Sequence, residues 1–513
     1  MMKYFPEDWP MVDEPGPRRA GVARAIIRAA ASAPGAGGVY LGAGATGPAW
    51  GGNERAVLVL GPPRSGKTSS IVVPAILGAA GAVVSTSTKP DVLTATAAAR
   101  AEQGPCFLYD PSGTVTPPPD VEPVRWSPVT SCASWDDALL MARALVRAAR
   151  PGRVPGADHW TERAEALLGP LLHAAALQEM GMTDVLAWVD RRESAHALGA
   201  LDASGATIAG NLLAGIAVTD PREQSGIWST ASGVLGAYRS EAALATTVRP
   251  NFDGQALCEQ SGTLYVCATG RRQAAVAPLV VGLVTEVRAA AYARAAEGRT
   301  GPPVLLALDE VANIAPIDDL PAMVSEGGGQ GLLTLACLQD LSQARSRWGP
   351  AADGFLSLFG IKIVLPGIGD TTTLQALSRL AGDEEVVTRS ISAPAAGPGG
   401  GVLTRLLRGR RGAMWPAPPS VTTATVRRPR LAVDDIARGH QGAGLVVDER
   451  NAMGWVRLTP WFAEEPWRSA AAPSPRMRTA PAPGRDGPGR EGAGGDGPGR
   501  GAVHPPPEPD LGR

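Results

Sequence analysis

Six short runs of apolar residues recur along the chain, and the stretches between them mostly place apolar residues at helical spacing. Continuous apolar runs are typical of strands in a parallel sheet that helices cover on both faces, because neither side of such a strand meets water. The runs are residues 56–60, 81–85, 262–267, 304–308, 332–337 and 361–365. The pattern predicts an α/β fold with a mostly parallel sheet.

Residues 134–250 carry a different pattern, in which strand signals are scarce. Ser134 can cap a helix whose first turn is acidic, and acidic residues at that end suit the helix dipole. A second helical pattern covers residues 160–180 and is interrupted by Gly169-Pro170. We therefore expect an all-α insertion domain at 134–250, which divides the sheet domain into 51–133 and 251–465.

Both ends of the chain have biased composition. Residues 1–50 are rich in Gly, Ala and Pro, hold one plausible short helix at 22–31, and are expected to be poorly structured otherwise. Residues 466–513 consist largely of Pro, Gly and Arg. Such a segment buries too little apolar surface to offset the entropy of ordering it, so we expect a disordered tail.

Charge and cysteine content narrow the class of protein. The 513 residues include 48 Lys+Arg and 49 Asp+Glu, a net charge of −1, so bulk charge demands neither a nucleic-acid nor a membrane partner. The five cysteines form no CxxC or Cys/His cluster. Buried, reduced thiols are the expected state, rather than a zinc site or a disulfide framework.

Neither a secretory signal nor a convincing transmembrane helix is visible in the sequence. The N-terminal residues are acidic and Pro-rich and lack an apolar core segment. Residues 71–88 carry no charge, but they contain Pro74 and several glycines. A buried helix followed by a buried strand explains this stretch better than a membrane span.

A phosphate-binding loop follows the first apolar run. Its sequence matches G-x-x-x-x-G-K-[ST], in which backbone N–H groups surround the β-phosphate, the lysine reaches the β- and γ-phosphates, and the hydroxyl binds Mg²⁺. The helix expected at 69–77 points its positive N-terminus at the anion. The candidate nucleotide-binding residues are Gly61, Pro62, Pro63, Arg64, Ser65, Gly66, Lys67, Thr68 and Ser69.

Two acidic residues follow the apolar run at 304–308. A buried strand there delivers Asp309 and Glu310 to the carboxyl edge of the sheet. Asp309, together with Thr68, is the candidate Mg²⁺ ligand, and Glu310 is the candidate residue that orients and polarises the attacking water. An apolar strand followed by two acids is a weak signal alone, and gains its meaning from the P-loop earlier in the chain.

Gln339 follows the apolar run at 332–337. A glutamine at a strand end beside bound phosphates can sense the γ-phosphate or position water, so Gln339 joins Lys67 and Glu310 as a candidate catalytic residue. The alternative is a surface amide without a role.

Taken in this order, these motifs resemble the type IV secretion coupling proteins, the TraG-like conjugative DNA-transfer ATPases. The resemblance covers roughly residues 55–465. It rests on GPPRSGKT (61–68), STSTKPDVL (85–93), YDPSG (109–113), WSPV (126–129), LDEVANIAPIDDLP (308–321), QGLLTLACLQDLSQ (330–343), KIVLPG (362–367) and the closing WVRLTPW (455–461).

The resemblance implies a RecA-like nucleotide-binding domain interrupted by an all-α domain, with ATP and Mg²⁺ as cofactors. It further implies a homo-hexameric ring that moves DNA, single-stranded or bound to a relaxase, toward a type IV secretion channel at the cytoplasmic face of the cell membrane. On the matching positions, Lys67 and Thr68 serve phosphate and Mg²⁺, Asp309 and Glu310 serve Mg²⁺ and water, and Gln339 senses the γ-phosphate.

This sequence departs from the family pattern in two ways. Many members begin with transmembrane helices, and none is recognisable here. The family also usually carries an arginine, acting on a neighbour's site, in the segment that reads Ser325–Gly331 (SEGGGQG) in this chain. Arg345 and Arg347 are the nearest alternatives in sequence, with a solvated helix face as the competing interpretation for both.

Two arginine clusters are candidate DNA contacts, since arginine binds phosphate in a salt-sensitive manner. They consist of Arg405, Arg408, Arg410 and Arg411, and of Arg427, Arg428 and Arg430. A merely solvated stretch is an equal alternative for the first. His159 and His173 lie in the helical region and are expected to be structural.

Two other functions remain open from the sequence. One is an adaptor that recruits substrate through the helical domain and uses nucleotide as a switch. The other is a ring translocase for chromosome or plasmid partition, against which the DEVANIAPI segment argues.

Overall fold

The computed structural model describes residues 19–32, 38–45, 47–149, 157–268, 273–299, 301–392 and 420–471. Within these ranges, all six apolar runs form strands of one twelve-stranded sheet with the order β2-β1-β14-β13-β10-β3-β9-β8-β4-β7-β5-β6. The six are β3 (Val57–Leu60), β4 (Val83–Ser87), β7 (Thr263–Cys267), β8 (Val304–Leu308), β9 (Leu332–Leu338) and β10 (Ile361–Val364).

The section of the sheet from β10 to β6 is parallel throughout. It is completed by β5 (Cys106–Tyr109) and the two-residue β6 (Glu122–Pro123). Every residue of β3, β4, β7, β8, β9 and β10 is buried, as the uninterrupted apolar runs require. The prediction of an α/β fold with a mostly parallel sheet is confirmed.

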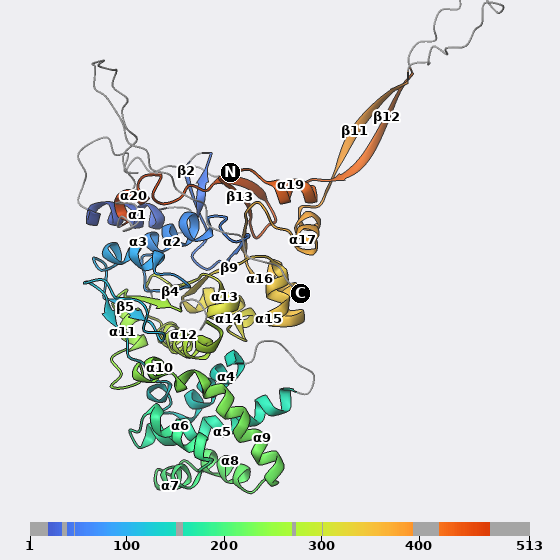
Figure 1. Ribbon diagram of the computed structural model, residues 1–513. Helices are drawn as coiled ribbons and strands as arrows, with labels where there is room; N and C mark the ends of the chain where they lie inside the picture. Colours follow the sequence, from blue (N-terminus) through green and yellow to red (C-terminus); the bar gives the residue numbers. More distant parts are fainter. Residues whose placement is uncertain are drawn as a thin grey trace, which may run out of the picture. The chain divides into compact units, whose positions relative to one another are not determined.

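Helices cover both faces of the sheet (Figure 1). One face packs against α1 (Arg19–Ser32), α2 (Val73–Gly78) and α3 (Asp91–Arg100). The opposite face packs against helices from the second half of the chain, led by α12 (Gln273–Ala296). The others are α13 (Val311–Ile314), α14 (Leu320–Glu326), α15 (Leu341–Trp348), α16 (Phe355–Leu358) and α17 (Thr371–Ala381).

The N-terminal segment is more ordered than the sequence predicts. Besides α1, it forms β1 (Tyr40–Gly44) and β2 (Gly47–Trp50), and β1 pairs antiparallel with β14 (Met453–Arg457). The helix expected at 22–31 is confirmed by α1, whereas the expectation that the rest of residues 1–50 is poorly structured is wrong for β1 and β2. Residues 1–18 lie outside the described part of the chain. β13 (Ala443–Val447) joins this antiparallel end of the sheet to β10.

An aromatic cluster explains this order at the edge of the sheet. The ring centroids of Tyr40 and Trp467 are 4.7 Å apart, and Trp50 lies 6.3 Å from Trp467. Trp467 begins α20 (Trp467–Ala470), which also contacts α1. Large aromatic side chains contribute substantial apolar burial, so they hold β1, β2 and α20 together at this edge of the sheet. Residues 466–471 of the expected tail are therefore ordered, which corrects the prediction for them, and residues 472–513 lie outside the described residues.

The elements between Trp135 and Ala245 are all helical, as expected. They are α4 (Trp135–Ala149), α5 (Ala157–Leu177), α6 (Met182–Arg191), α7 (Ala195–Ala203), α8 (Thr207–Ala217), α9 (Pro221–Val234), the 3₁₀ turn η3 (Leu235–Arg239) and α10 (Glu241–Ala245). α4 packs against α12, so the helical region shares a core with one face of the sheet. Its status as a separate domain with limits at 134 and 250 stays a prediction.

The predicted interruption at Gly169-Pro170 is wrong, because α5 is continuous through Pro170. Proline removes one backbone donor and ordinarily breaks a helix. Here the flanking side chains Leu167, Leu168, Leu171 and Leu172 are completely buried. Their burial offsets the loss of one hydrogen bond. Tertiary packing thus overrides the local signal.

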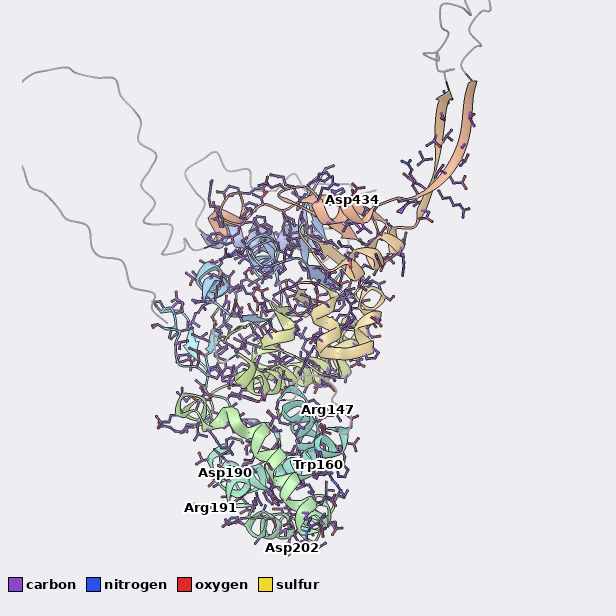
Figure 2. All side chains as sticks on the ribbon, turned by 45° about the vertical axis from the view of Figure 1, so that its right-hand side comes forward. Arg147, Trp160, Asp190, Arg191, Asp202 and Asp434 are labelled. Carbon is purple, nitrogen blue, oxygen red and sulfur yellow. The ribbon has the colours of Figure 1, made fainter. Side chains whose placement is uncertain are left out.

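Specific contacts fix α5 among its neighbours (Figure 2). Trp160 of α5 lies against Gly226 of α9, where a Cβ atom would come within 2.4 Å of the indole. Arg147 of α4 pairs with Glu165 of α5 at 2.6 Å. His173 is buried and its Nδ1 lies 2.9 Å from the Cys132 carbonyl oxygen, in agreement with a structural role.

One helix passes a membrane-span test by length and composition. The stretch is Ala275–Ala296 of α12, and 61% of its apolar window is buried inside the protein. No other helix in the described ranges passes the same test. Leu279, Leu283 and Val287 of this stretch belong to the core between the sheet and the helical region. We therefore interpret α12 as a core helix. Residues 71–88, the other apolar stretch, form a helix and then β4, as predicted.

A half-buried carboxylate on α12, that of Glu286, connects the segments that enter and leave the helical region. Glu286 accepts hydrogen bonds from Trp126 Nε1 at 2.6 Å, from the Ser131 hydroxyl and from Gly254 N at 3.1 Å. Burial raises the pKa of Glu286, while these three donors oppose the rise. The carboxylate therefore contributes mainly as a shared acceptor for two chain segments, residues 126–131 and the turn at Gly254.

We expect Glu286→Ala to lower the free energy of unfolding by about 3 kcal/mol, because the three donors are then buried without an acceptor. Urea unfolding of the full chain measures the difference. Glu297→Ala is the matched control, since the Glu297 side chain forms an exposed ion pair with Arg299 and no other ion pair or hydrogen bond within the described ranges. It should change stability by less than about 0.5 kcal/mol. Equal effects of the two substitutions would contradict a structural role for Glu286.

A separate two-stranded hairpin consists of β11 (Asp383–Ser392) and β12 (Ser420–Pro429). These strands pair only with each other among the described elements, and Arg427 lies 3.6 Å from Glu385 across the ladder. The second arginine cluster is thus on an exposed ribbon and its adjoining turn. The first cluster, Arg405 to Arg411, lies outside the described residues. DNA contact by either cluster stays a prediction.

Candidate functional site

The P-loop connects the carboxyl end of β3 to a helix, as the motif requires. Gly61 N donates to the Leu338 carbonyl oxygen of β9 at 3.1 Å, which fixes the start of the loop. Arg64 and Gly66 have φ values of 65° and 94°. Such left-handed backbone is easy for glycine and strained for arginine, so the loop is held in shape by its surroundings. A Cβ atom on Gly61 would come within 2.9 Å of Leu365.

The helix that follows the P-loop starts with a π-helical turn. This turn is η1 (Thr68–Val72), and it continues directly into α2. Ser70 N donates to the Gly66 carbonyl oxygen at 2.8 Å, so the first helical hydrogen bond closes over the loop. The predicted strand, loop and helix are all present. The free N–H groups of this turn point toward the anion position that the motif predicts.

Lys67 lies inside the loop rather than in solvent. Its Nζ atom donates to the carbonyl oxygens of Gly61 at 2.5 Å and of Pro62 at 2.9 Å. The ammonium is therefore held over the concave side of the loop by two neutral acceptors. Phosphate oxygens are stronger, charged acceptors, so the same geometry suits a lysine that binds the β- and γ-phosphates.

The two candidate Mg²⁺ ligands are in direct contact. The Thr68 hydroxyl donates to Asp309 Oδ2 at 2.7 Å, across 241 residues of sequence. β9 lies between β3 and β8, so the residues that follow these three strands share one edge of the sheet. A hydroxyl and a carboxylate side by side are oxygen ligands that suit Mg²⁺. The residues present thus fit the metal.

The burial of Asp309 affects the pKa of its carboxyl group. The side chain is only 7% exposed, and this burial raises the pKa of its carboxyl, against the lowering effects of the Thr68 hydrogen bond and of Lys67.

The Thr86 hydroxyl donates to the Asp309 carbonyl oxygen at 3.3 Å. Thr86 belongs to the STSTKPDVL segment, to which the sequence assigned no role. Its only signal was a run of hydroxyl residues inside a buried strand.

Glu310 turns away from the strand direction through an unusual backbone. Its φ and ψ of 53° and 47° are left-handed, which is rare for a residue that is not glycine. This conformation begins α13, and the carboxylate accepts from Asn313 Nδ2 at 3.3 Å. Glu310 is half-buried at the same sheet edge as Asp309. It is therefore placed to hold a water molecule near the loop, although its catalytic role stays a prediction.

Gln339 is brought to this edge by β9, between the P-loop strand and the strand of the acids. Its backbone N donates to Gln343 Oε1 at 3.0 Å, and the side chain is exposed. Asp340 then caps α15 by accepting from Ser342 N at 2.8 Å. The γ-phosphate role of Gln339 stays a prediction.

The two candidate arginines both have partners within the chain. Arg345 pairs with Asp370 at 2.8 Å, and the pKa of Asp370 is lowered, against the effect of burial, by Thr373 and Arg345. Arg347 donates to the carbonyl oxygens of Arg147 at 3.1 Å and Pro316 at 2.9 Å. These contacts favour structural roles over action on a neighbouring molecule.

The geometry agrees with a comparison against known families. A model of the family described as type IV secretory system conjugative DNA transfer matches residues 18–398, well over half of the chain. The chain belongs to this family. The sequence resemblance to TraG-like coupling proteins is thereby confirmed.

Among curated proteins, this family member is similar to the conjugal transfer protein TraG of Escherichia coli. The two are 27% identical over 414 residues, which cover 74% of this chain and 61% of TraG. This chain therefore spans about three fifths of the length of that relative.

Two solved structures show the same fold. The unbound bacterial conjugative coupling protein TrwBdeltaN70 matches with a TM-score of 0.63 at 17% identity, over 86% of this chain and 92% of that one. The plasmid coupling protein TrwB in complex with ADP and Mg²⁺ matches with a TM-score of 0.58 at 18% identity, over 80% and 86%. At such identities the likeness supports the RecA-like P-loop fold of this family member.

Proposed function

We propose that this chain is an ATP-hydrolysing coupling protein that delivers DNA, or a relaxase bound to DNA, to a type IV secretion channel during conjugation. The observation that carries the proposal is the meeting of Lys67, Thr68 and Asp309 at one sheet edge, in a member of the conjugative DNA transfer family. Glu310 and Gln339 follow the adjacent strands at the same edge.

ATP and Mg²⁺ are the proposed cofactors. TrwB, which shares the fold, has been solved with a non-hydrolysable ATP analogue and with ADP and Mg²⁺. In this chain the P-loop N–H groups and Lys67 would bind the phosphates, and Thr68 and Asp309 would hold the metal. Bound Mg²⁺ would neutralise charge on the β- and γ-phosphates.

The proposed catalytic roles are supported by the places of Glu310 and Gln339 after adjacent strands of the sheet. Glu310 orients and polarises the attacking water, and Gln339 registers the γ-phosphate from the strand next to the P-loop. The energy released would drive movement of DNA. We further propose a homo-hexameric ring, with relaxase and channel proteins as partners, on the cytoplasmic side of the cell membrane where ATP and DNA are present.

The test is ATP hydrolysis by the full chain with and without single- and double-stranded DNA. We expect hydrolysis that DNA stimulates at least threefold, and loss of hydrolysis in Lys67→Ala because the phosphates lose their cation. Arg438→Ala, at an exposed ion pair with Asp434, should match wild type. Nucleotide binding without hydrolysis under every DNA condition would overturn the motor and favour a nucleotide-switched adaptor.

A further inference from the structure

A second cavity lies at the end of the sheet opposite the P-loop. It has a volume of about 400 Å³ and is lined by the turn before β3, the start of β10, α14, α16 and the β13–β14 turn. Ala56 and Gly360, which precede β3 and β10, are in its wall. β3 alone spans about 13 Å, so the cavity is separate from the nucleotide site. The charged and hydroxyl residues that line the cavity are Glu54, Arg55, Ser325, Ser357, Lys362 and Glu449.

Lys362 is the buried charge of this cavity. The residue is 2% exposed, and among the described residues its Nζ donates only to the Asp448 carbonyl oxygen, at a long 3.4 Å. Within the described residues, no carboxylate oxygen lies within 4.0 Å of that ammonium. The Asp448 carboxylate instead accepts from Arg450 N and Ala452 N, both at 2.8 Å, inside its own turn.

An ammonium group has three donors, and a buried charge without a counter-charge is costly. Burial accordingly lowers the pKa of Lys362, with Asp448 opposing the shift. The cavity wall therefore presents a cation whose hydrogen-bonding capacity is mostly unused by the described residues. A carboxylate that enters the cavity would supply both the missing charge and the missing acceptors.

Acidic groups surround the exposed part of the same cavity. Arg55 pairs with Glu449 at 2.7 Å, and these side chains are 55% and 41% exposed. Glu54 is exposed and has no ion pair within the described residues. The four charged residues of the lining sum to zero, with the cation buried and the free carboxylate outside. A doubly charged phosphate would face Glu54 and Glu449, whereas a molecule with opposite charges at its ends matches this arrangement.

We propose that this cavity binds a small zwitterion of the amino-acid or short-peptide class, with its carboxylate on Lys362 and its ammonium toward Glu54. The volume lies within the range of small-molecule sites, roughly 300–1,000 Å³. Ser325 and Ser357 offer hydroxyl groups to the backbone of the ligand between its two ends. This site is independent of the proposed ATPase function, because its residues are at the other end of the strands.

Three matched probes separate the charges of the ligand: triglycine, N-acetyl-triglycine, which lacks the ammonium, and triglycine amide, which lacks the carboxylate. The chain has only four lysines, so full-length protein with ¹³Cε-labelled lysine gives a site-specific readout. We expect triglycine to shift the Lys362 signal and to bind at least tenfold tighter than triglycine amide. The signal of Lys89, which is exposed, should not move.

Variants test each half of the proposal. Lys362→Met should weaken triglycine binding at least tenfold in saturation-transfer measurements, with Lys89→Met as control; replacing a buried charge by an apolar chain commonly preserves folding. Glu54→Gln, at an exposed position, should abolish the preference for triglycine over N-acetyl-triglycine. Equal binding of triglycine and its amide, an unchanged affinity in Lys362→Met, or tighter binding of inorganic phosphate would overturn the site.

Discussion

Glu310→Gln lowers the rate of ATP hydrolysis by about 10²- to 10⁴-fold and leaves nucleotide affinity within about threefold of wild type, the range expected when a positioned proton acceptor is lost. The substitution keeps the size of the side chain, and its amide oxygen can still accept from Asn313. What disappears is the charge that polarises water. Single-turnover hydrolysis and fluorescent-nucleotide binding, measured on the same preparations, check the two halves of this expectation.

The matched control is Asn313→Ala, which removes the hydrogen bond to Glu310 but keeps the carboxylate. We expect a loss of less than tenfold there, since the left-handed backbone at Glu310 already aims the side chain. Hydrolysis by Glu310→Gln at the wild-type rate would show that another group positions the water. A comparable loss of nucleotide affinity would instead point to damage to the loop.

Asp309→Asn should abolish the Mg²⁺ dependence of nucleotide binding, which we expect to cost about 100-fold or more in affinity for the Mg²⁺ complex. Asparagine keeps an acceptor for the Thr68 hydroxyl, so the P-loop should hold its shape. The charge that attracts the metal is gone. Titration of nucleotide with and without Mg²⁺ measures the effect, and an unchanged Mg²⁺ dependence would exclude Asp309 as a ligand.

The same substitution should stabilise the protein when metal and nucleotide are absent. Burial raises the pKa of Asp309 above its ordinary 3.8, so the folded chain retains a proton that the unfolded chain has already released. Stability therefore falls as pH rises from about 3.8 through the raised pKa, and the penalty is fully present above that pKa. Asparagine carries no such penalty, so its melting temperature at pH 7 should be higher by about 1–3 °C. A lower melting temperature would contradict this account.

The sequence predicted the elements whose side chains are uniform in character. The six apolar runs became buried strands because both of their faces lie against helices, and the P-loop motif carries its own geometry. The strands β1 and β2 of the antiparallel edge were not predicted, because their sequences, YLGAG and GPAW, have no strand pattern. Their order comes from contacts of Tyr40 and Trp50 with Trp467, more than 400 residues later.

For the site, the sequence predicted which residues take part, but it did not predict their contacts or their backbone conformations. Nothing local indicates that Thr68 contacts Asp309, since that hydrogen bond depends on the order of β3, β9 and β8 in the sheet. The left-handed backbone at Glu310 and the role of Thr86 likewise arise from packing at the sheet edge. At Gly169-Pro170 the local sequence predicts a break in the helix, but α5 is continuous there because the neighbouring leucines are buried.

The contacts of Arg347 have a mechanical consequence for the molecule. α15 begins two residues after Gln339 and is about 12 Å long. Near its other end, Arg347 donates a hydrogen bond to the carbonyl oxygen of Arg147 in the last turn of α4. The helix α15 thus connects the sheet edge where the γ-phosphate would be sensed to the helical region. Since only Asp340 separates Gln339 from α15, a displacement of Gln339 would tilt α15 and so act on α4 through Arg347.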